Sequence, residues 1–291
     1  MEAHEMWKET AGETTRLPGV EAWEEEREGF RVSTVKVLSP EGARELGKPE
    51  GTYVTLMLSG LLRREESAFP RAVTALAAEL RPLLPPGEGG VLVVGLGNRS
   101  ITPDAVGPLC ADHILVTRHL IHQAPEHFGA FRPVAALAAG VLGTTGMESG
   151  EMVAALVEKI SPACVIAVDA LASRSLGRVC RTVQLSDTGI VPGSGVGNDR
   201  FALNKETLGV PVIALGVPTV VDAATLCADV LAGAGLSECD PSVLGEAAAG
   251  VIVTPREIDS QVSDLSKVLG YGINQALQKD LSLADLEMLL S

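Results

Sequence analysis

Hydrophobic residues form two kinds of run along this chain. The runs at residues 91–94 (VLVV), 165–168 (VIAV) and 212–215 (VIAL) are apolar at every position. Such runs are typical of strands that are covered by helices on both sides. They alternate with segments of helical periodicity, in the order that produces β-α repeats. The pattern predicts an α/β fold, a doubly wound, mostly parallel sheet with helices on both faces.

The expected elements follow from these runs and from the residues that interrupt them. Pro85, Pro86 and Gly87 end the first long helix, and Pro255 opens the last one. Residues 232–250 are small and weakly patterned, so we expect a surface connection there. The predicted strands cover residues 31–38, 51–58, 91–96, 134–137, 164–169, 179–185, 210–216 and 251–253, and the predicted helices cover residues 68–84, 104–115, 148–160, 220–231 and 256–279.

The first 30 residues differ from the rest in charge and periodicity. They hold nine glutamates against three basic residues and show little regular pattern before Phe30. A charged segment of this kind is usually loosely attached. We therefore expect residues 1–30 to be an acidic leader, a candidate propeptide, and residues 31–291 to form a single α/β domain.

Composition excludes several classes of protein. The formal net charge of −14 and the 3% aromatic content disfavour nucleic-acid binding, because there is no basic patch and few rings to stack on bases. No apolar run reaches the length of a membrane span, and the N-terminus does not resemble a signal peptide, so we expect a cytosolic protein. The five cysteines form no C-x-x-C pair and are expected to be reduced core thiols.

Two aspartates, Asp104 and Asp169, lie 65 residues apart in the chain and stand at the ends of two buried strands. In an open parallel sheet, such ends form the crevice where ligands and catalytic groups collect. Two carboxyl groups in one crevice can divide acid and base work. Each aspartate also has a structural interpretation, because Thr102, Pro103 and Asp104 suit a helix start and Asp169 could cap a following helix. Both interpretations stay open at this level.

Two glycine-rich segments lie beside these strand ends. The turn at residues 95–98 (GLGN) lacks the third glycine of a dinucleotide fingerprint, and its backbone amides at Gly97 and Asn98 are candidate oxyanion donors. The loop at residues 186–198 has four glycines and one proline but no P-loop lysine. Long loops in compact domains are often functional, so we expect this loop to hold substrate. Its candidate residues are Asp187, Gly193, Ser194 and Gly195.

Other hydrolytic schemes fit this chain less well. All five histidines lie within the first 127 residues, so Ser194 cannot belong to the Ser…Asp…His order of α/β-hydrolases. Cys110 and His113 share one helix face, which more often indicates core packing. His113, His119 and His122 have no matching carboxylate at metal-ligand spacing. We therefore expect an enzyme with no cofactor and no metal.

Longer motifs add a resemblance. The chain resembles the germination protease (spore protease) family of endospore-forming bacteria, in order from about residue 51 to residue 277. The motifs that carry it are VVGLGNRSITPDAVGP, VTRHL, FRPVAALAAGVLGTTGMES, IAVDALASRS, QLSDTGIVPGSGVGN, ETLGVPVIALGVPTVVDA and VTPREID. The resemblance implies an endopeptidase that begins the degradation of small acid-soluble spore proteins during germination, in the forespore or spore core. It also implies a homotetramer, an inactive zymogen, cleavage after an acidic residue, and catalytic roles for Asp104 and Asp169.

Two departures from the family pattern stand out. Family zymogens carry a processing sequence similar to R-T-D-L-A-V-E-A, whereas residues 15–22 read T-R-L-P-G-V-E-A. The acidic residue is missing and Pro18 stands where the new N-terminus would fall, so the processing bond differs. Residues 232–250 are also shorter than the corresponding family segment.

Two other functions remain as alternatives. Hydrogenase-maturation peptidases are similar in fold and share the G-N-x-x-x-T turn and a D-A strand end, but they bind a metal through two carboxylates and a later histidine. This chain has no histidine after His127. The second alternative is a non-catalytic scaffold on the same fold, against which the presence of both aspartates argues.

Overall fold

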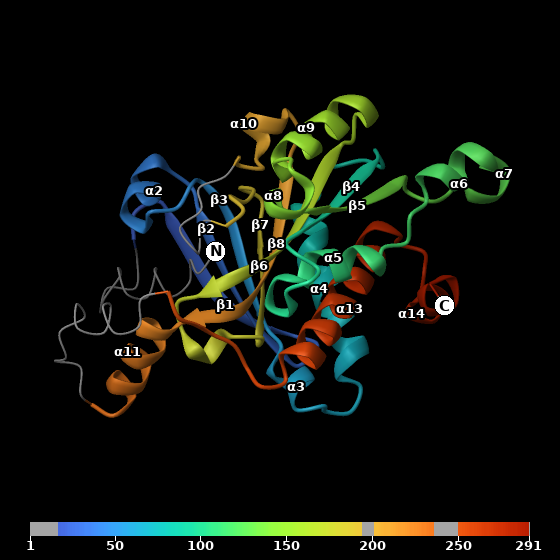
Figure 1. Cartoon of the computed structure of the whole chain (residues 1–291). Coiled ribbons are helices and arrows are strands. Elements are labelled where there is room, and N and C mark those ends of the chain that lie inside the picture. Colours follow the sequence, from blue (N-terminus) through green and yellow to red (C-terminus); the bar gives the residue numbers. More distant parts are fainter. Residues whose placement is uncertain (1–16, 194–200, 236–249, 291) are drawn as a thin grey trace.

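The computed structural model describes residues 17–193, 201–235 and 250–290, which form one large sheet with helices packed against both of its faces (Figure 1). No helix within these ranges is both long and apolar enough to cross a membrane. The strands are β1 (Val20–Arg27), β2 (Phe30–Val37), β3 (Gly51–Met57), β4 (Val91–Leu96), β5 (Val134–Gly140), β6 (Cys164–Ser173), β7 (Thr182–Ser186), β8 (Val212–Asp222) and β9 (Ile252–Val253).

Most helices lie between strands or at the C-terminal end. The α-helices are α2 (Pro40–Leu46), α3 (Ser59–Leu62), α4 (Ala68–Leu80), α5 (Val106–Asp112), α6 (Arg118–Gln123), α7 (Pro125–Phe128), α8 (Leu142–Thr145), α9 (Ser149–Ile160), α10 (Lys205–Leu208), α11 (Ala223–Gly233), α13 (Ile258–Leu277) and α14 (Leu283–Leu289). The described residues also contain three short 3₁₀ turns, η1 (Arg81–Leu83), η2 (Thr102–Asp104) and η3 (Leu176–Arg178).

The sheet is mixed in direction. Its strand order is β1-β2-β3-β7-β8-β6-β4-β5, and β9 pairs with β8 off this path. The neighbours β8, β6, β4 and β5 run parallel to one another, and every other pairing in the sheet is antiparallel. The α/β class and the helices on both faces are confirmed. The expectation of a mostly parallel sheet holds only for those four strands, because β1, β2, β3 and β7 add an antiparallel half.

Alternate residues of the central strands enter two different cores. On one face, Val93, Val168 and Leu215 join a cluster with residues of α4, α5 and α13. On the other face, Leu92 and Ala167 pack with residues of α9 and α10. Burying a large aliphatic side chain stabilises the fold by about 1.5–3 kcal/mol. The two cores therefore explain why the central strands are apolar at every position.

The acidic leader differs from what its charge predicts. Residues 20–27 form β1, which pairs antiparallel with β2 along its whole length. Glu28 and Gly29 connect the two strands with φ angles of 53° and 77°, the positive values that a tight two-residue hairpin requires. The expectation of a loosely attached leader is therefore wrong for residues 17–30, and residues 1–16 lie outside the described residues.

β1 is also tied to the helical layer by an ion pair. Arg27 Nε donates to Glu79 Oε1 of α4 over 3.0 Å. The Glu79 residue is only 8% exposed. Burial raises the pKa of Glu79, and the hydrogen bond and charge of Arg27 oppose that rise. This contact joins the first strand to the main body, so the strand is part of the fold.

Several element ends lie away from their predicted positions. β6 continues to Ser173 and β8 continues to Asp222. α11 then begins at Ala223, where the Asp222 carboxylate accepts a hydrogen bond from Ala224 N over 2.8 Å. The predicted helix at residues 104–115 is shorter, because η2 precedes α5. β6 and β8 therefore extend the sheet past the ends of their apolar runs, where the edge of the crevice was predicted.

The contact between α5 and the sheet depends on two glycines. A Cβ atom on Gly107 of α5 would lie 2.5 Å from Val168 O of β6 and would also collide with the backbone of Leu96 in β4. A Cβ atom on Gly95 of β4 would collide with the Gly107 carbonyl. Only glycine permits backbones to approach this closely. The start of α5 therefore lies directly on β4 and β6.

We predict that Gly107→Ala destabilises the protein by about 3 kcal/mol, because the new methyl group must force α5 away from the sheet. Gly233→Ala is the matched control, since Gly233 is also helical but has open space around its Cβ position. Urea unfolding measures both variants. Equal stability of the two alanine variants would contradict the close contact.

Candidate active site

Asp169 lies within a strand. It is 6% exposed, and its Oδ1 accepts a hydrogen bond from Ala170 N over 2.9 Å. β6 continues for four residues beyond it, so the interpretation of Asp169 as the cap of a following helix is wrong. Its cross-strand partner in β8 is Gly216, which has no side chain. The aspartate carboxylate is therefore held at a fixed position on the sheet.

Asp104 reaches the same region from the segment that follows β4. It is the last residue of η2, and its Oδ2 accepts a hydrogen bond from Asn98 N over 2.7 Å. A Cβ atom on Gly97 would lie 3.0 Å from Asp104 Oδ1 and would collide with the Asp104 carbonyl. Gly97 adopts a φ of 108°, which glycine tolerates. The GLGN turn therefore folds against this aspartate.

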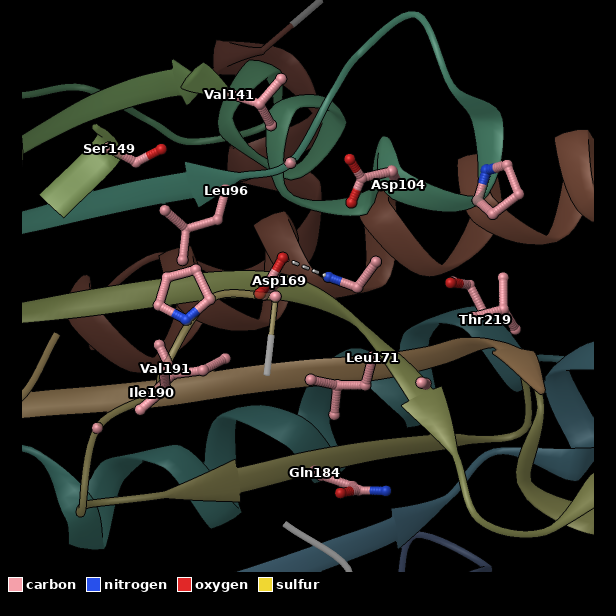
Figure 2. A pocket seen from close by; sticks show the side chains of 18 of the residues that line it. Leu96, Asp104, Val141, Ser149, Asp169, Leu171, Gln184, Ile190, Val191 and Thr219 are labelled. Carbon is pink, nitrogen blue, oxygen red and sulfur yellow. Dashed lines mark hydrogen bonds between the residues drawn. The ribbon is translucent and has the colours of Figure 1, made fainter. Parts of the chain in front are cut away.

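β4, which leads into the Asp104 segment, and β6, which carries Asp169, are neighbours. β4 pairs parallel with β6, and Gly95 lies opposite Val168, the residue before Asp169. The adjacency that the strand-end argument required is thus present in the fold. Figure 2 shows the side chains of Asp104 and Asp169 at the same cavity, with the Asp169 hydrogen bond as a dashed line.

That cavity has a volume of about 1030 Å³. It extends from η2 and β6 across the sheet to the antiparallel half, and its floor and walls are largely apolar. Four charged residues line it: the cationic Lys48 and Arg174 and the two aspartates. Its size and its combination of apolar walls with converging polar groups are typical of a ligand-binding cleft.

The remaining predicted site residues are placed as follows. Gly97 lines the cavity, whereas the Asn98 amide donates to Asp104 and is already engaged. Gly193 also lines the cavity. Asp187 does not line it, because its Oδ1 accepts from Thr52 N over 2.7 Å and ties the loop to β3. Ser194 and Gly195 lie outside the described residues.

Several lining residues were not predicted as site residues from the sequence. Lys48 precedes β3, Tyr53 lies within β3, and Gln184 lies within β7. These residues come from the antiparallel half of the sheet, and Lys48 and Tyr53 are far from both aspartates in the chain. Arg174 follows the IAVDALAS run directly and was the easiest of them to find. Only the strand order reveals the others.

Three of the cysteines are core groups, and His113 is half-buried at the C-terminal end of α5. Cys110, Cys164 and Cys180 are buried and form no disulfide. Burial raises the pKa of Cys164 to about 11 and that of Cys180 to about 12, so these thiols stay protonated and unreactive. Burial, together with the nearby Lys267, lowers the pKa of His113. The prediction of reduced core thiols is confirmed for these three cysteines.

Metal-ligating side chains do not cluster in the described part of the chain. Within residues 17–193, 201–235 and 250–290, no three His, Cys, Asp or Glu side chains gather in a way that could hold a metal ion. No histidine is among the cavity-lining residues of those ranges. The aspartates there lack the third ligand that the maturation-type alternative requires.

A family model described as germination protease matches residues 1–233. This chain belongs to the germination protease family. The germination protease of Clostridium perfringens (strain ATCC 13124) is 44% identical over 290 residues, which cover 91% of this chain and 89% of that protein. The germination protease of Caldanaerobacter subterraneus subsp. tengcongensis is 42% identical over 318 residues, covering 100% and 96% of the two chains.

A solved structure with a similar arrangement is the [NiFe] hydrogenase maturation protease HycI from Thermococcus kodakarensis KOD1. It is 18% identical, covers 64% of this chain and 94% of its own, and superimposes with a TM-score of 0.35. A superposition at this level adds nothing to the functional assignment, which depends on the close germination protease relatives.

Membership in the germination protease family confirms the resemblance that the motifs carry. It supports peptidase activity and a role in germination for this chain. The two motifs that contain Asp104 and Asp169 both lie inside the matched residues. A peptidase of this family therefore has both carboxyl groups at one cleft.

Proposed function

We propose that the protein is an endopeptidase that begins the degradation of small acid-soluble spore proteins in the spore core during germination. Asp104 and Asp169 activate the hydrolytic water. The observation that carries this proposal is the convergence of the two carboxyl groups on one cleft, from segments 65 residues apart in the chain. Membership in the germination protease family supports the peptidase reaction.

The chemistry assigned to the pair needs one proton and one water. One carboxylate accepts a proton from the water as it attacks the scissile carbonyl carbon, and the other carboxyl group donates a proton to the leaving nitrogen. Asp169 is only 6% exposed, and electrostatic interactions at a buried carboxyl group are stronger than in bulk water. The backbone amides of Gly97 and Asn98 were the two candidate oxyanion donors. The Asn98 amide already donates to Asp104, so the N–H of Gly97 remains as the donor.

The two cationic residues of the cleft bear on which substrate charge the site prefers. Lys48 and Arg174 line the same cavity as the aspartates. A cation in a partly apolar cleft favours an acidic side chain on the bound peptide. This arrangement supports cleavage after an acidic residue. The zymogen state and the homotetramer belong to the same proposal and are supported by family membership.

We predict that Asp104→Asn and Asp169→Asn each lower kcat on a small acid-soluble spore protein by about 10²- to 10⁴-fold, because each change removes one half of the acid–base pair. Thermal unfolding should stay close to that of the wild type, since asparagine matches aspartate in size. Asp264→Asn is the matched control, because Asp264 lies exposed on α13 and away from the cavity. Full turnover by Asp169→Asn would refute the assignment.

Treatment with a metal chelator distinguishes the aspartate-pair mechanism from the metal-dependent alternative. We expect cleavage of the spore protein to continue in excess EDTA, with the same new termini by mass spectrometry, because the water is activated by carboxyl groups alone. Loss of activity in EDTA that returns with added Zn²⁺ or Mn²⁺ would instead favour the maturation-type mechanism.

The preference for an acidic residue is also measurable. Two peptides are compared that differ only in the residue before the cut, which is Glu in one and Gln in the other. We predict that Lys48→Met or Arg174→Gln lowers the kcat/KM of the Glu peptide relative to that of the Gln peptide by about three- to ten-fold. Cleavage of the Gln peptide should change little. If both variants keep the wild-type ratio, these cations do not read the acidic side chain.

A further inference from the structure

Gln184 combines burial with an unsatisfied side chain. It is 1% exposed, and neither its Oε1 nor its Nε2 has a hydrogen-bond partner among the described residues. A buried amide without partners destabilises the free protein, because folding removes its hydrogen bonds to water and replaces them with none. Groups of this kind persist in native proteins when something other than stability requires them.

Gln184 also lines the active-site cavity. Other buried polar side chains lack a partner for one atom, such as Gln261 Oε1 and Gln275 Oε1, but these residues do not line the cavity. Among the described residues that line this cleft, Gln184 is the glutamine whose two amide atoms both lack a hydrogen-bond partner. Its donor and its acceptor are thus unsatisfied in the wall of the cavity where a substrate binds.

Sheet register fixes where Gln184 stands relative to Asp169. Gly216 of β8 is the cross-strand partner of both residues, Gln184 on one side and Asp169 on the other. Cross-strand partners project from the same face of a sheet. Because adjacent strands are about 4.8 Å apart, the two residues are separated by roughly 10 Å. Figure 2 shows Gln184 beyond β8 from Asp169, at the same cavity.

The residue between them opens a path along the cleft. Gly216 presents no side chain, so no group of this cross-strand row stands between the aspartate and the glutamine. An extended peptide advances about 3.3 Å per residue, and the separation corresponds to about three residues of bound substrate. The row therefore suits a peptide that crosses the sheet from the aspartates toward β7.

We propose that Gln184 binds an amide group of the substrate about three residues from the scissile bond, its Nε2 donating to the amide oxygen and its Oε1 accepting from the amide N–H. A carboxylate could use only the donor and an ammonium group only the acceptor, whereas an amide satisfies both. The amide belongs to the substrate main chain or to an Asn or Gln side chain. This inference depends on the proposed peptidase function.

The test compares Gln184→Leu with the wild type on a small acid-soluble spore protein and on peptides that span its mapped cut. We expect kcat/KM to fall by about ten- to a hundred-fold. The change should appear mainly in KM, because a contact remote from the reacting bond acts equally on ground and transition states. The melting temperature should stay or rise, since leucine removes two unsatisfied polar atoms.

Two further variants serve as controls for this comparison. Gln275→Leu is the matched control, a glutamine with an unsatisfied Oε1 outside the cavity, and its kcat/KM should equal that of the wild type. Gln184→Met replaces the amide without branching and serves if the leucine variant does not fold. A merely structural role for Gln184 predicts the opposite pattern, a lower melting temperature with unchanged KM.

Modified peptides identify the amide. N-methylation of single backbone amides at the second to fourth residues on each side of the cut tests the main chain, and Asn or Gln to Ala changes there test side chains. We expect one modification to weaken the wild type but to have no further effect in Gln184→Leu. The inference is overturned if Gln184→Leu cleaves within two-fold of the wild type, or if every modification affects both proteins equally. If the activated, mature form of the wild type does not cleave the spore protein, the proposed function itself fails, before any variant is compared.

Discussion

The packing of α5 onto β4 and β6 is the constraint on which the site depends. Gly95 and Gly107 allow the backbones to touch, and no larger residue fits at that contact. The chain leaving β4 must therefore turn back within a few residues, and this turn carries Asp104 over the neighbouring strand. Asp169 needs no such device, because β6 itself holds it.

The antiparallel half of the sheet gives the cleft its width. The parallel strands β4, β6 and β8 supply the two aspartates and the apolar floor, whereas β3 and β7 contribute Tyr53 and Gln184 from the opposite side. A sheet of parallel strands alone would end near β8 and would leave a narrower crevice. The mixed topology thus provides a binding surface that is several strands wide.

Periodicity located the central strands well because burial on both faces demands apolar residues at every position. The runs at residues 91–94 and 165–168 are visible for this reason, and both aspartates were found by their place beside them. The class of the fold and the neighbourhood of β4 and β6 followed from the same signal.

Other features are determined by long-range contacts and were missed. β1 resembles a solvated leader because its exposed positions are mostly glutamates, and only the Glu28–Gly29 turn signals the hairpin. The extension of β6 past Asp169 depends on pairing with β8, which adds Leu171 and Ser173 to the ladder. Gln184 is the first residue of the quoted motif QLSDTGIVPGSGVGN, but only the strand register shows that it lies opposite Gly216 at the site.

The glutamates of β1 have a consequence for self-association. In the described part of the chain, β1 is the outer strand of the antiparallel half, and Glu21, Glu24, Glu25 and Glu26 are exposed along it. If a second copy docked its own β1 there, two acidic ladders would face each other at strand spacing, and their repulsion would oppose continuous sheet growth. Pairing of two copies through this edge strand is therefore disfavoured.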